Sequence, residues 1–104
     1  MAKIVNTSNF RGTVEESNKV VVVDFFATWC GPCKMLAPVF DSLSEELTDV
    51  DFVKVDIDQS LELAQKFGIT TVPTMMIFKD GKVVDTLVGF MPKDNLKAKV
   101  QAHL

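Results

Sequence analysis

The only two cysteines and the only tryptophan of the chain lie within five residues, in the segment WCGPC that begins at Trp29. A Cys-x-x-Cys pair supports one of three kinds of chemistry. Cys30 and Cys33 can form a structural disulfide, supply half of a metal site, or work as a redox-active dithiol that exchanges with other disulfides. The rest of the sequence decides among these.

The first two kinds of site fit the sequence poorly. A Cys30–Cys33 bridge closes a loop of about 4 residues, for which the chain-entropy relation gives only about 2 kcal/mol of stabilisation. A chain of 104 residues buries enough core to fold without such a bridge. A zinc site needs four ligands, or three with an open position. The only histidine is His103, near the C-terminus, and no other cysteine is present, so no metal site is expected.

A redox-active dithiol explains each residue of the segment. Cys30 follows an apolar strand and precedes a helix, whose free N–H groups and positive dipole end favour a thiolate. Gly31 permits a tight turn that leaves the Cys30 sulfur uncovered, and Pro32 suits the first turn of a helix. Cys33 lies inside that turn and is expected to be less accessible. One thiol that attacks and one that resolves are what disulfide exchange requires.

The composition and the N-terminal segment argue against several other functions and locations. The net charge is −3 and no basic stripe appears, so nucleic-acid binding has no electrostatic support. No apolar run approaches the roughly 18 residues of a membrane span. The N-terminal segment MAKIVNTSNF lacks the apolar stretch of a secretory signal. We therefore expect one intracellular domain over residues 1–104, in a compartment where thiols are normally reduced.

Alternating strands and helices must position the dithiol. Strands are expected over residues 3–5, 20–27, 51–58, 74–79 and 82–89, and helices over 8–17, about 33–47, 60–67 and 93 to about 103. Helices between the first three strands imply parallel pairing. Asp80-Gly81 between the last two strands predicts a two-residue antiparallel hairpin. The fold class is therefore α/β with a mixed sheet. Pro38 is expected to break or kink the helix that follows the dithiol.

Two charged residues in the strands have a possible role near the cysteines. Asp24 interrupts the apolar run VVVVDFFA and shares its face with Val22 and Phe26, so we expect it to be buried. The alternative, an edge-strand aspartate in solvent, fits these neighbours poorly. Burial would raise the pKa of Asp24 and let it accept or donate a proton. Lys54 falls on the polar face of its alternating strand, and periodicity alone predicts a solvated lysine there.

The chain resembles the thioredoxin family over essentially its whole length. The resemblance rests on WCGPCK in its strand-to-helix context, together with VVVVDFFA, FVKVDID, VPT at 72–74, the hairpin FKDGK and Val88-Gly89. It implies a single-domain thioredoxin fold, a central mixed β-sheet flanked by helices, and an activity that reduces protein disulfides. CGPC separates the reducing members from oxidising or isomerising relatives. The chain departs from many members at Phe26, where they carry tryptophan.

The resemblance also implies roles for individual residues. Cys30 would attack the target, Cys33 would resolve the mixed disulfide, and Asp24 would take the proton of Cys33. Lys54 would approach Asp24 and modulate it, as Gly31 and Pro32 modulate the cysteines. Pro73 would be cis and expose the backbone of Val72 to a substrate strand. A docking patch around Cys30 is expected to contain Trp29, Val72, Pro73 and Gly89.

Partners follow from the same resemblance. A thioredoxin reductase, usually flavin-dependent and supplied by NADPH, would reduce the Cys30–Cys33 disulfide after each turnover, and the targets would be disulfide-containing proteins. The chain has no glycine-rich nucleotide loop, so no cofactor of its own is expected. We expect a cytoplasmic monomer. Two alternatives stay open at this point: a binding module whose dithiol is a redox switch, and an oxidase or isomerase on the same fold.

Overall fold

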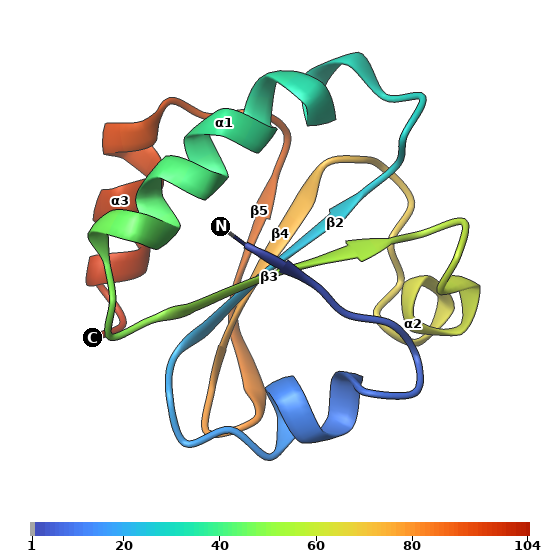
Figure 1. Cartoon of the computed structure of the whole chain (residues 1–104), viewed down its shortest axis with the longest axis horizontal. Coiled ribbons are helices and arrows are strands. Elements are labelled where there is room, and N and C mark those ends of the chain that lie inside the picture. Colours follow the sequence, from blue (N-terminus) through green and yellow to red (C-terminus); the bar gives the residue numbers. More distant parts are fainter. Residues whose placement is uncertain (1) are drawn as a thin grey trace.

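The structure is a computed structural model that describes residues 2–104. Within these residues the chain forms a five-stranded sheet in the order β1-β3-β2-β4-β5 (Figure 1). The strands are β1 Lys3–Ile4, β2 Val21–Phe26, β3 Asp51–Asp56, β4 Thr74–Lys79 and β5 Lys82–Val88. The helices are α1 Gly31–Glu46, α2 Leu61–Lys66 and α3 Lys93–Gln101, and a short π-helix spans Arg11–Glu15. None of these helices is long and apolar enough to cross a membrane.

The sheet is mixed, as predicted. β3 pairs in parallel with both β1 and β2, whereas β4 pairs antiparallel with β2 and with β5. β2 therefore lies at the centre of the sheet, and its C-terminal end leads directly into the dithiol segment. Asp80 and Gly81 connect β4 to β5 with φ values of 53° and 77°. Two successive positive φ values define the two-residue hairpin turn that Asp-Gly predicts.

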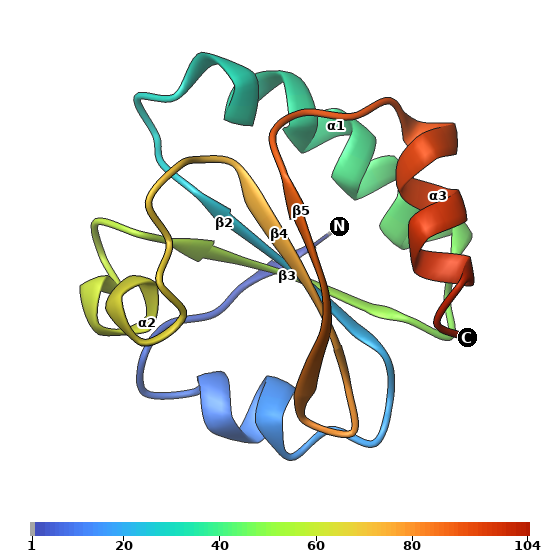
Figure 2. The same cartoon turned by 180° about the vertical axis from the view of Figure 1, so that it is seen from behind.

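Helices cover both faces of the sheet (Figures 1 and 2). α1 and α3 lie on one face, where the first core cluster includes Leu36, Phe40 and Leu96. α2 and the π-helix lie on the other face, where the second cluster includes Phe10, Val14 and Leu63. Because both faces are covered, residues 21–25 of β2 are all fully buried. This confirms that the apolar run is a central strand.

Two helix predictions differ from the structure. The first predicted helix, residues 8–17, is a π-helix of only five residues, Arg11–Glu15, near which both Phe10 and Val14 are buried. The second helix begins at Gly31 rather than near Cys33, because Cys30 takes an extended backbone conformation and acts as the N-cap. α1 then continues through Pro38 to Glu46. It therefore does not end at the proline.

β3 alternates between two faces of the sheet, but neither face is open to solvent as periodicity suggests. Val53 and Val55 pack in the second core. The opposite face is not a solvent face, however, because α1 covers this side of the sheet. Phe52 is buried in the first core and Lys54 is half-buried. Lys54 therefore projects into a partly enclosed space on the face that also carries Asp24.

Candidate active site

The cysteine pair lies at the N-terminal end of α1. β2 ends at Phe26, a short loop follows, and Cys30 caps the helix with φ −91° and ψ 117°. Cys30 and Cys33 form a disulfide, and their Cα atoms are 5.2 Å apart. Pro32 lies in the first helical turn, where its missing N–H has no intrahelical acceptor to lose. The two cysteines are therefore joined where the helix presents its free N–H groups.

The helix end acts directly on the sulfur of Cys30. The backbone N–H of Cys33 donates a hydrogen bond to Cys30 Sγ over 3.1 Å. This bond and the positive end of the helix dipole would stabilise a thiolate at Cys30 once the disulfide is reduced. Both cysteines are almost completely buried, with 5% and 4% of their surface exposed. The expected difference in accessibility is thus absent from the disulfide form, although Gly31 and Pro32 between them are exposed.

The segment before β4 approaches the dithiol from the opposite side. The Val72–Pro73 peptide bond is cis, as the family resemblance implies. The carbonyl oxygen of Val72 lies 3.6 Å from Cys30 Sγ. A disulfide sulfur carries no hydrogen, so this is a close contact here and becomes a possible hydrogen bond only for the thiol. Gly89, with φ 91°, donates its N–H to the carbonyl oxygen of Pro73 over 2.8 Å. Val72, Pro73 and Gly89 therefore lie beside Cys30.

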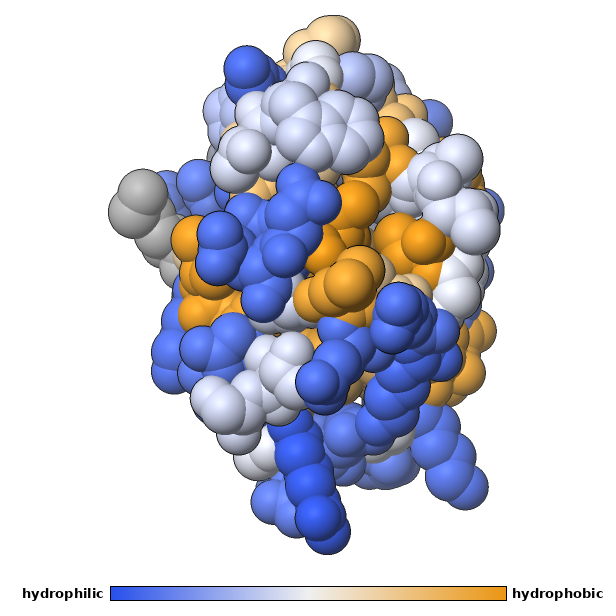
Figure 3. All heavy atoms as spheres, turned by 90° about the vertical axis from the view of Figure 1, so that its right-hand side faces the viewer, coloured by the Kyte–Doolittle hydropathy of each residue, from blue (hydrophilic) through white to orange (hydrophobic). Residues whose placement is uncertain are grey.

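An exposed aromatic side chain directly precedes Cys30 in the chain. Trp29 is 67% exposed, and its indole nitrogen donates a hydrogen bond to Asp58 over 2.9 Å. Figure 3 views the side of the molecule where α2 and the loop before α1 lie in Figure 1. Apolar residues gather in the middle of that face, with hydrophilic residues around them. Exposed apolar surface with a polar rim is typical of an interaction site.

Two residues of this region were not predicted. Ile57 packs against the small cluster formed by Ala27, Cys30 and Cys33, and Asp58 accepts the hydrogen bond of the Trp29 indole. Both residues follow β3, the strand beside β2. The carboxyl ends of parallel neighbouring strands meet at one edge of a sheet, so residues that follow β3 lie near residues that follow β2. This rule could have identified both residues from the sequence.

Asp24 is fully buried, as predicted. Neither of its carboxyl oxygens has a hydrogen-bond partner among residues 2–104. Burial raises the pKa of Asp24 from 3.8 to about 7, the Lys54 ammonium opposes this shift, and the Asp41 carboxylate adds to it. A carboxyl group with a pKa near 7 can exchange its proton at neutral pH.

Lys54 lies opposite Asp24 across the parallel pair of β2 and β3. Its ammonium group is 4.9 Å from the centre of the Phe26 ring. A groove of about 200 Å³ separates this group from the start of α1, and it is lined by Phe26, Ala27, Thr28, Cys33, Lys34, Ala37 and Lys54. The groove therefore brings solvent to Cys33 and to the lysine that neighbours Asp24.

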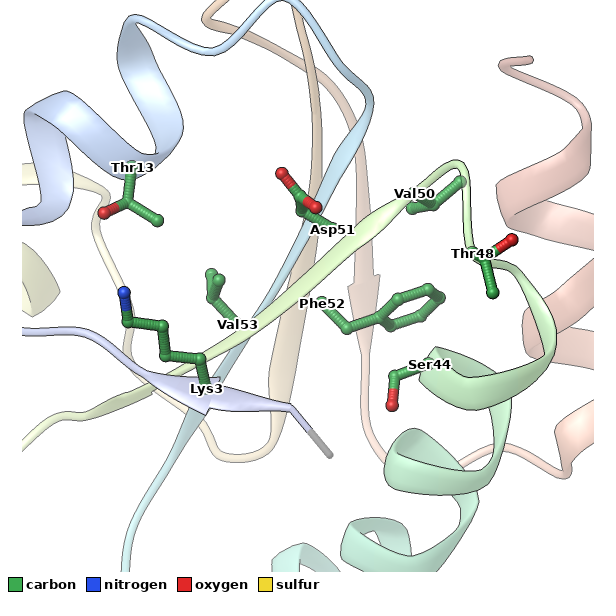
Figure 4. A pocket seen from close by; sticks show the side chains of 8 residues that line it. All are labelled: Lys3, Thr13, Ser44, Thr48, Val50, Asp51, Phe52 and Val53. Carbon is green, nitrogen blue, oxygen red and sulfur yellow. The ribbon is translucent and has the colours of Figure 1, made fainter.

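A larger cavity lies away from the dithiol. It measures about 460 Å³ and borders the start of β3, with walls from β1, the π-helix and the end of α1 (Figure 4). Its lining residues are Lys3, Thr13, Ser44, Thr48, Val50, Asp51, Phe52 and Val53. None of them belongs to the predicted site. This cavity therefore does not mark the chemistry of the protein, whereas the cysteine pair does.

A reversible cysteine pair at a thiolate-stabilising helix end defines a class of protein, the thiol–disulfide oxidoreductases. Known proteins resemble this chain over nearly its full length and identify the family within that class. A sequence profile described as Thioredoxin matches residues 1–102. The chain belongs to the thioredoxin family.

Individual relatives agree with this assignment. Thioredoxin of Bacillus subtilis is 46% identical over 102 residues, which cover 97% of this chain and 98% of the relative. Thioredoxin 1 of Synechococcus elongatus is 46% identical over 105 residues, covering 100% and 98% of the two chains. The solved structure of Plasmodium falciparum thioredoxin superposes with a TM-score of 0.91 at 39% identity, covering 99% of this chain and 100% of that one.

These similarities establish the fold and the general activity. The chain has the thioredoxin fold, a five-stranded mixed sheet flanked by helices. Like the family, it is a protein-disulfide oxidoreductase with a Cys30–Cys33 redox pair. Its partners are, in general terms, disulfide-containing proteins and a reductase that restores the dithiol.

Proposed function

We propose that this protein works in the reducing direction, as a general reductant of disulfides in cytoplasmic proteins. The observation that carries the direction is the sequence Gly31-Pro32 between the cysteines, which the reducing members of the family share. The bond from the Cys33 N–H to Cys30 Sγ, 3.1 Å long, at the N-terminus of α1 supports the exchange chemistry itself. A donor aimed at this sulfur favours its thiolate, which is the attacking species in disulfide exchange.

The reaction proceeds in two exchanges. The Cys30 thiolate attacks one sulfur of the target disulfide; a bond forms between Cys30 and that sulfur, and the other target sulfur leaves as a thiolate. Cys33 then loses its proton and attacks Cys30 Sγ. This step forms the Cys30–Cys33 disulfide and releases the second target thiolate. Two electrons pass to the target, and both of its sulfurs end as thiols after protonation.

Asp24 is the proposed acceptor of the Cys33 proton. Its raised pKa, about 7, suits proton transfer at neutral pH, and its burial keeps the carboxyl group away from competing charges other than Lys54 and Asp41. Cys33 and Lys54 line one groove, and water in it would carry the proton from Cys33 towards Asp24, which does not line the groove itself. Lys54 acts as a modulator because its ammonium favours the ionised form of Asp24.

The target docks on the surface around Cys30. An extended target segment would pair with the exposed backbone of Val72, while Trp29, Pro73 and Gly89 contact its side chains. Gly31 and Pro32 are exposed between the cysteines and leave room for the approaching sulfur. Backbone pairing with little side-chain selection fits a reductant with many targets.

The proposal also covers the reductase partner, the oligomeric state and the cellular location of the protein. A flavin-dependent thioredoxin reductase, supplied with electrons by NADPH, would reduce the Cys30–Cys33 disulfide again. The working unit would be a cytoplasmic monomer, a single domain over residues 1–104. The family supports a reductase partner in general, and the acidic surface, with a net charge of −3, gives no sign of a nucleic-acid partner.

The redox midpoint of the dithiol tests the proposed direction. Trp29 is the only tryptophan, no tyrosine is present, and Trp29 precedes Cys30, so its fluorescence reports the dithiol alone. We expect a midpoint below the glutathione poise of about −220 to −260 mV in a titration against thiol–disulfide buffers. A midpoint well above that range would indicate an oxidant or isomerase, and the absence of any transition would indicate a binding module.

A further inference from the structure

Three side chains on neighbouring strands share one face of the sheet. Asp24 and Phe26 are two residues apart on β2, so they point to the same side. Lys54 lies directly opposite Asp24 on β3. The ammonium group of Lys54 therefore has two acceptors within its range, the Asp24 carboxylate and the face of the Phe26 ring.

The Lys54 ammonium group contacts the Phe26 ring. Its ammonium nitrogen lies 4.9 Å from the centre of the Phe26 ring, inside the range of a cation–π contact. The Asp24 carboxyl group, by contrast, makes no hydrogen bond to any residue from 2 to 104. The arrangement is unexpected, because a buried carboxylate with a lysine on the next strand usually attracts the ammonium directly.

We propose that Phe26 is a positioning residue: its ring holds the Lys54 ammonium away from the Asp24 carboxylate and so limits how strongly Lys54 favours the ionised form of Asp24. The inference deepens the proposed function, on which its kinetic consequence rests. Its electrostatic part depends only on the geometry of Phe26, Lys54 and Asp24.

The other charges around Asp24 cannot produce the same effect. Lys54 of β3 and Asp41 of α1 are the two charged groups that act on Asp24. Asp41 accepts a hydrogen bond from the backbone N–H of Ala2 over 3.1 Å, which fixes its carboxylate. On β4 the direct partner of Asp24 is Met75, which carries no charge. Lys54 is therefore the only cation in this set, and the place where Phe26 holds it decides its effect.

The position of Phe26 also explains why the Lys54 side chain does not extend fully into solvent. Phe26 and Lys54 form adjacent walls of the groove that reaches Cys33, so the ammonium can stay hydrated on one side while its other side lies on the ring. Charged groups that keep part of their hydration lose little free energy on partial burial. Contact with the ring is therefore compatible with an exposed side of the ammonium, whereas contact with Asp24 requires fuller desolvation.

The test is a titration of Asp24 in the oxidised protein, in which neither cysteine titrates. The side-chain carboxyl carbon is followed by NMR after labelling of the aspartates, and Asp24→Asn assigns the signal. Phe26→Leu removes the ring but keeps an apolar side chain. We expect it to lower the Asp24 midpoint by about half a pH unit, because the ammonium then approaches the carboxylate. An unchanged or higher midpoint would overturn the proposal.

A second pair of variants separates positioning from a change in hydration. Lys54→Met removes the ammonium and should raise the midpoint of Asp24. In that background Phe26→Leu should leave the midpoint where it is, since no charge remains to be held. If Phe26→Leu lowers the midpoint equally in both backgrounds, the ring acts by excluding water and the proposal is wrong.

A conservative variant covers the possibility that Phe26→Leu does not fold. Tryptophan attracts cations more strongly than phenylalanine, so Phe26→Trp should raise the Asp24 midpoint, and a lowered or unchanged one contradicts the proposal. The rate at which Cys33 resolves a mixed disulfide is then measured against pH in single turnovers of Phe26→Leu. If the NMR midpoint moves and the rate profile does not, Phe26 positions Lys54 but Asp24 is not the proton acceptor.

Discussion

The indole nitrogen of Trp29 donates a hydrogen bond 2.9 Å long to the carboxylate of Asp58. This bond joins the loop before the dithiol to the segment that follows β3, and it holds an indole that is 67% exposed. A large aromatic side chain fixed on the surface loses little conformational entropy when a partner covers it. Asp58 would therefore prepare Trp29 for the docking role that we propose for it.

Asp58→Ala should weaken target binding and leave the redox chemistry unchanged. One hydrogen bond to a charged acceptor on the surface contributes about 1 kcal/mol, so we expect kcat/KM for a protein disulfide to fall about fivefold, mainly through KM. Asp58→Asn keeps an acceptor oxygen and should stay close to the parent. A changed redox midpoint with an unchanged KM in Asp58→Ala would show that Asp58 acts on the dithiol instead.

The two cysteines should fail in different ways when each is replaced. Cys30→Ser removes the attacking sulfur and should abolish turnover. Cys33→Ser leaves the attack intact but removes the resolving sulfur, so mixed disulfides with target proteins should accumulate. Non-reducing electrophoresis followed by mass spectrometry detects these adducts on Cys30. Full activity of Cys33→Ser would remove its resolving role, and activity that survives both replacements together would indicate a pure binding module.

The general plan of the site could be predicted from the sequence because each of its parts has a local signature. The cysteine spacing marks the dithiol, the apolar run marks β2 as central, and the odd polarity of Asp24 marks its burial. Asp80-Gly81 likewise marks the hairpin through the φ values that it permits. These features depend on residues that are close together in the chain, so periodicity and turn chemistry are sufficient to find them.

Contacts between neighbouring strands could not be predicted in this way. Periodicity alone put Lys54 on a polar face, and only the helix packed over that face shows that the lysine is half-buried beside Phe26. The bond between Trp29 and Asp58 joins residues 29 positions apart, and it depends on the register of β2 with β3. The start of α1 at Gly31 also escaped prediction, because propensity does not reveal that a cysteine sulfur serves as the cap.

Asp24→Ala should make the protein more stable at alkaline pH while slowing the reduction of targets. The pKa of Asp24 rises from 3.8 to about 7 on folding, so the folded protein holds this proton more tightly than the unfolded chain. The free energy of unfolding therefore falls as the pH rises through that window and changes no further above it. The shift corresponds to roughly 4 kcal/mol at most.

Urea unfolding of Asp24→Ala and the parent at pH 4 and pH 8 measures this effect. We expect the variant to gain stability relative to the parent at pH 8 and little or nothing at pH 4, where the parent carboxyl group is protonated. Asp49→Ala, at an exposed position, controls for the loss of one aspartate. A variant that is destabilised at pH 8 and reduces targets at the parent rate would refute both the buried charge and its role as proton acceptor.

Gly81 should tolerate a side chain less well than Gly68, although both have a left-handed backbone. Their φ values are 77° and 65°, so alanine costs about 1 kcal/mol or more at either position. A Cβ atom at Gly68 would meet nothing within 4 Å, whereas one at Gly81 would overlap the backbone carbonyl of Glu15 in the π-helix. The tip of the β4–β5 hairpin therefore packs directly against the π-helix, which contributes to the second core cluster.

Gly81→Ala must therefore shift the hairpin or the π-helix in addition to straining the turn. We expect Gly81→Ala to lower the free energy of unfolding by at least about 1 kcal/mol more than Gly68→Ala, in chemical denaturation of the oxidised protein. The redox midpoint should be unchanged in both variants, since neither glycine contacts the dithiol. Equal losses of stability would mean that the backbone at the contact between Gly81 and Glu15 can shift without loss of free energy. The positive φ of the turn would then be the only reason for a glycine at this position.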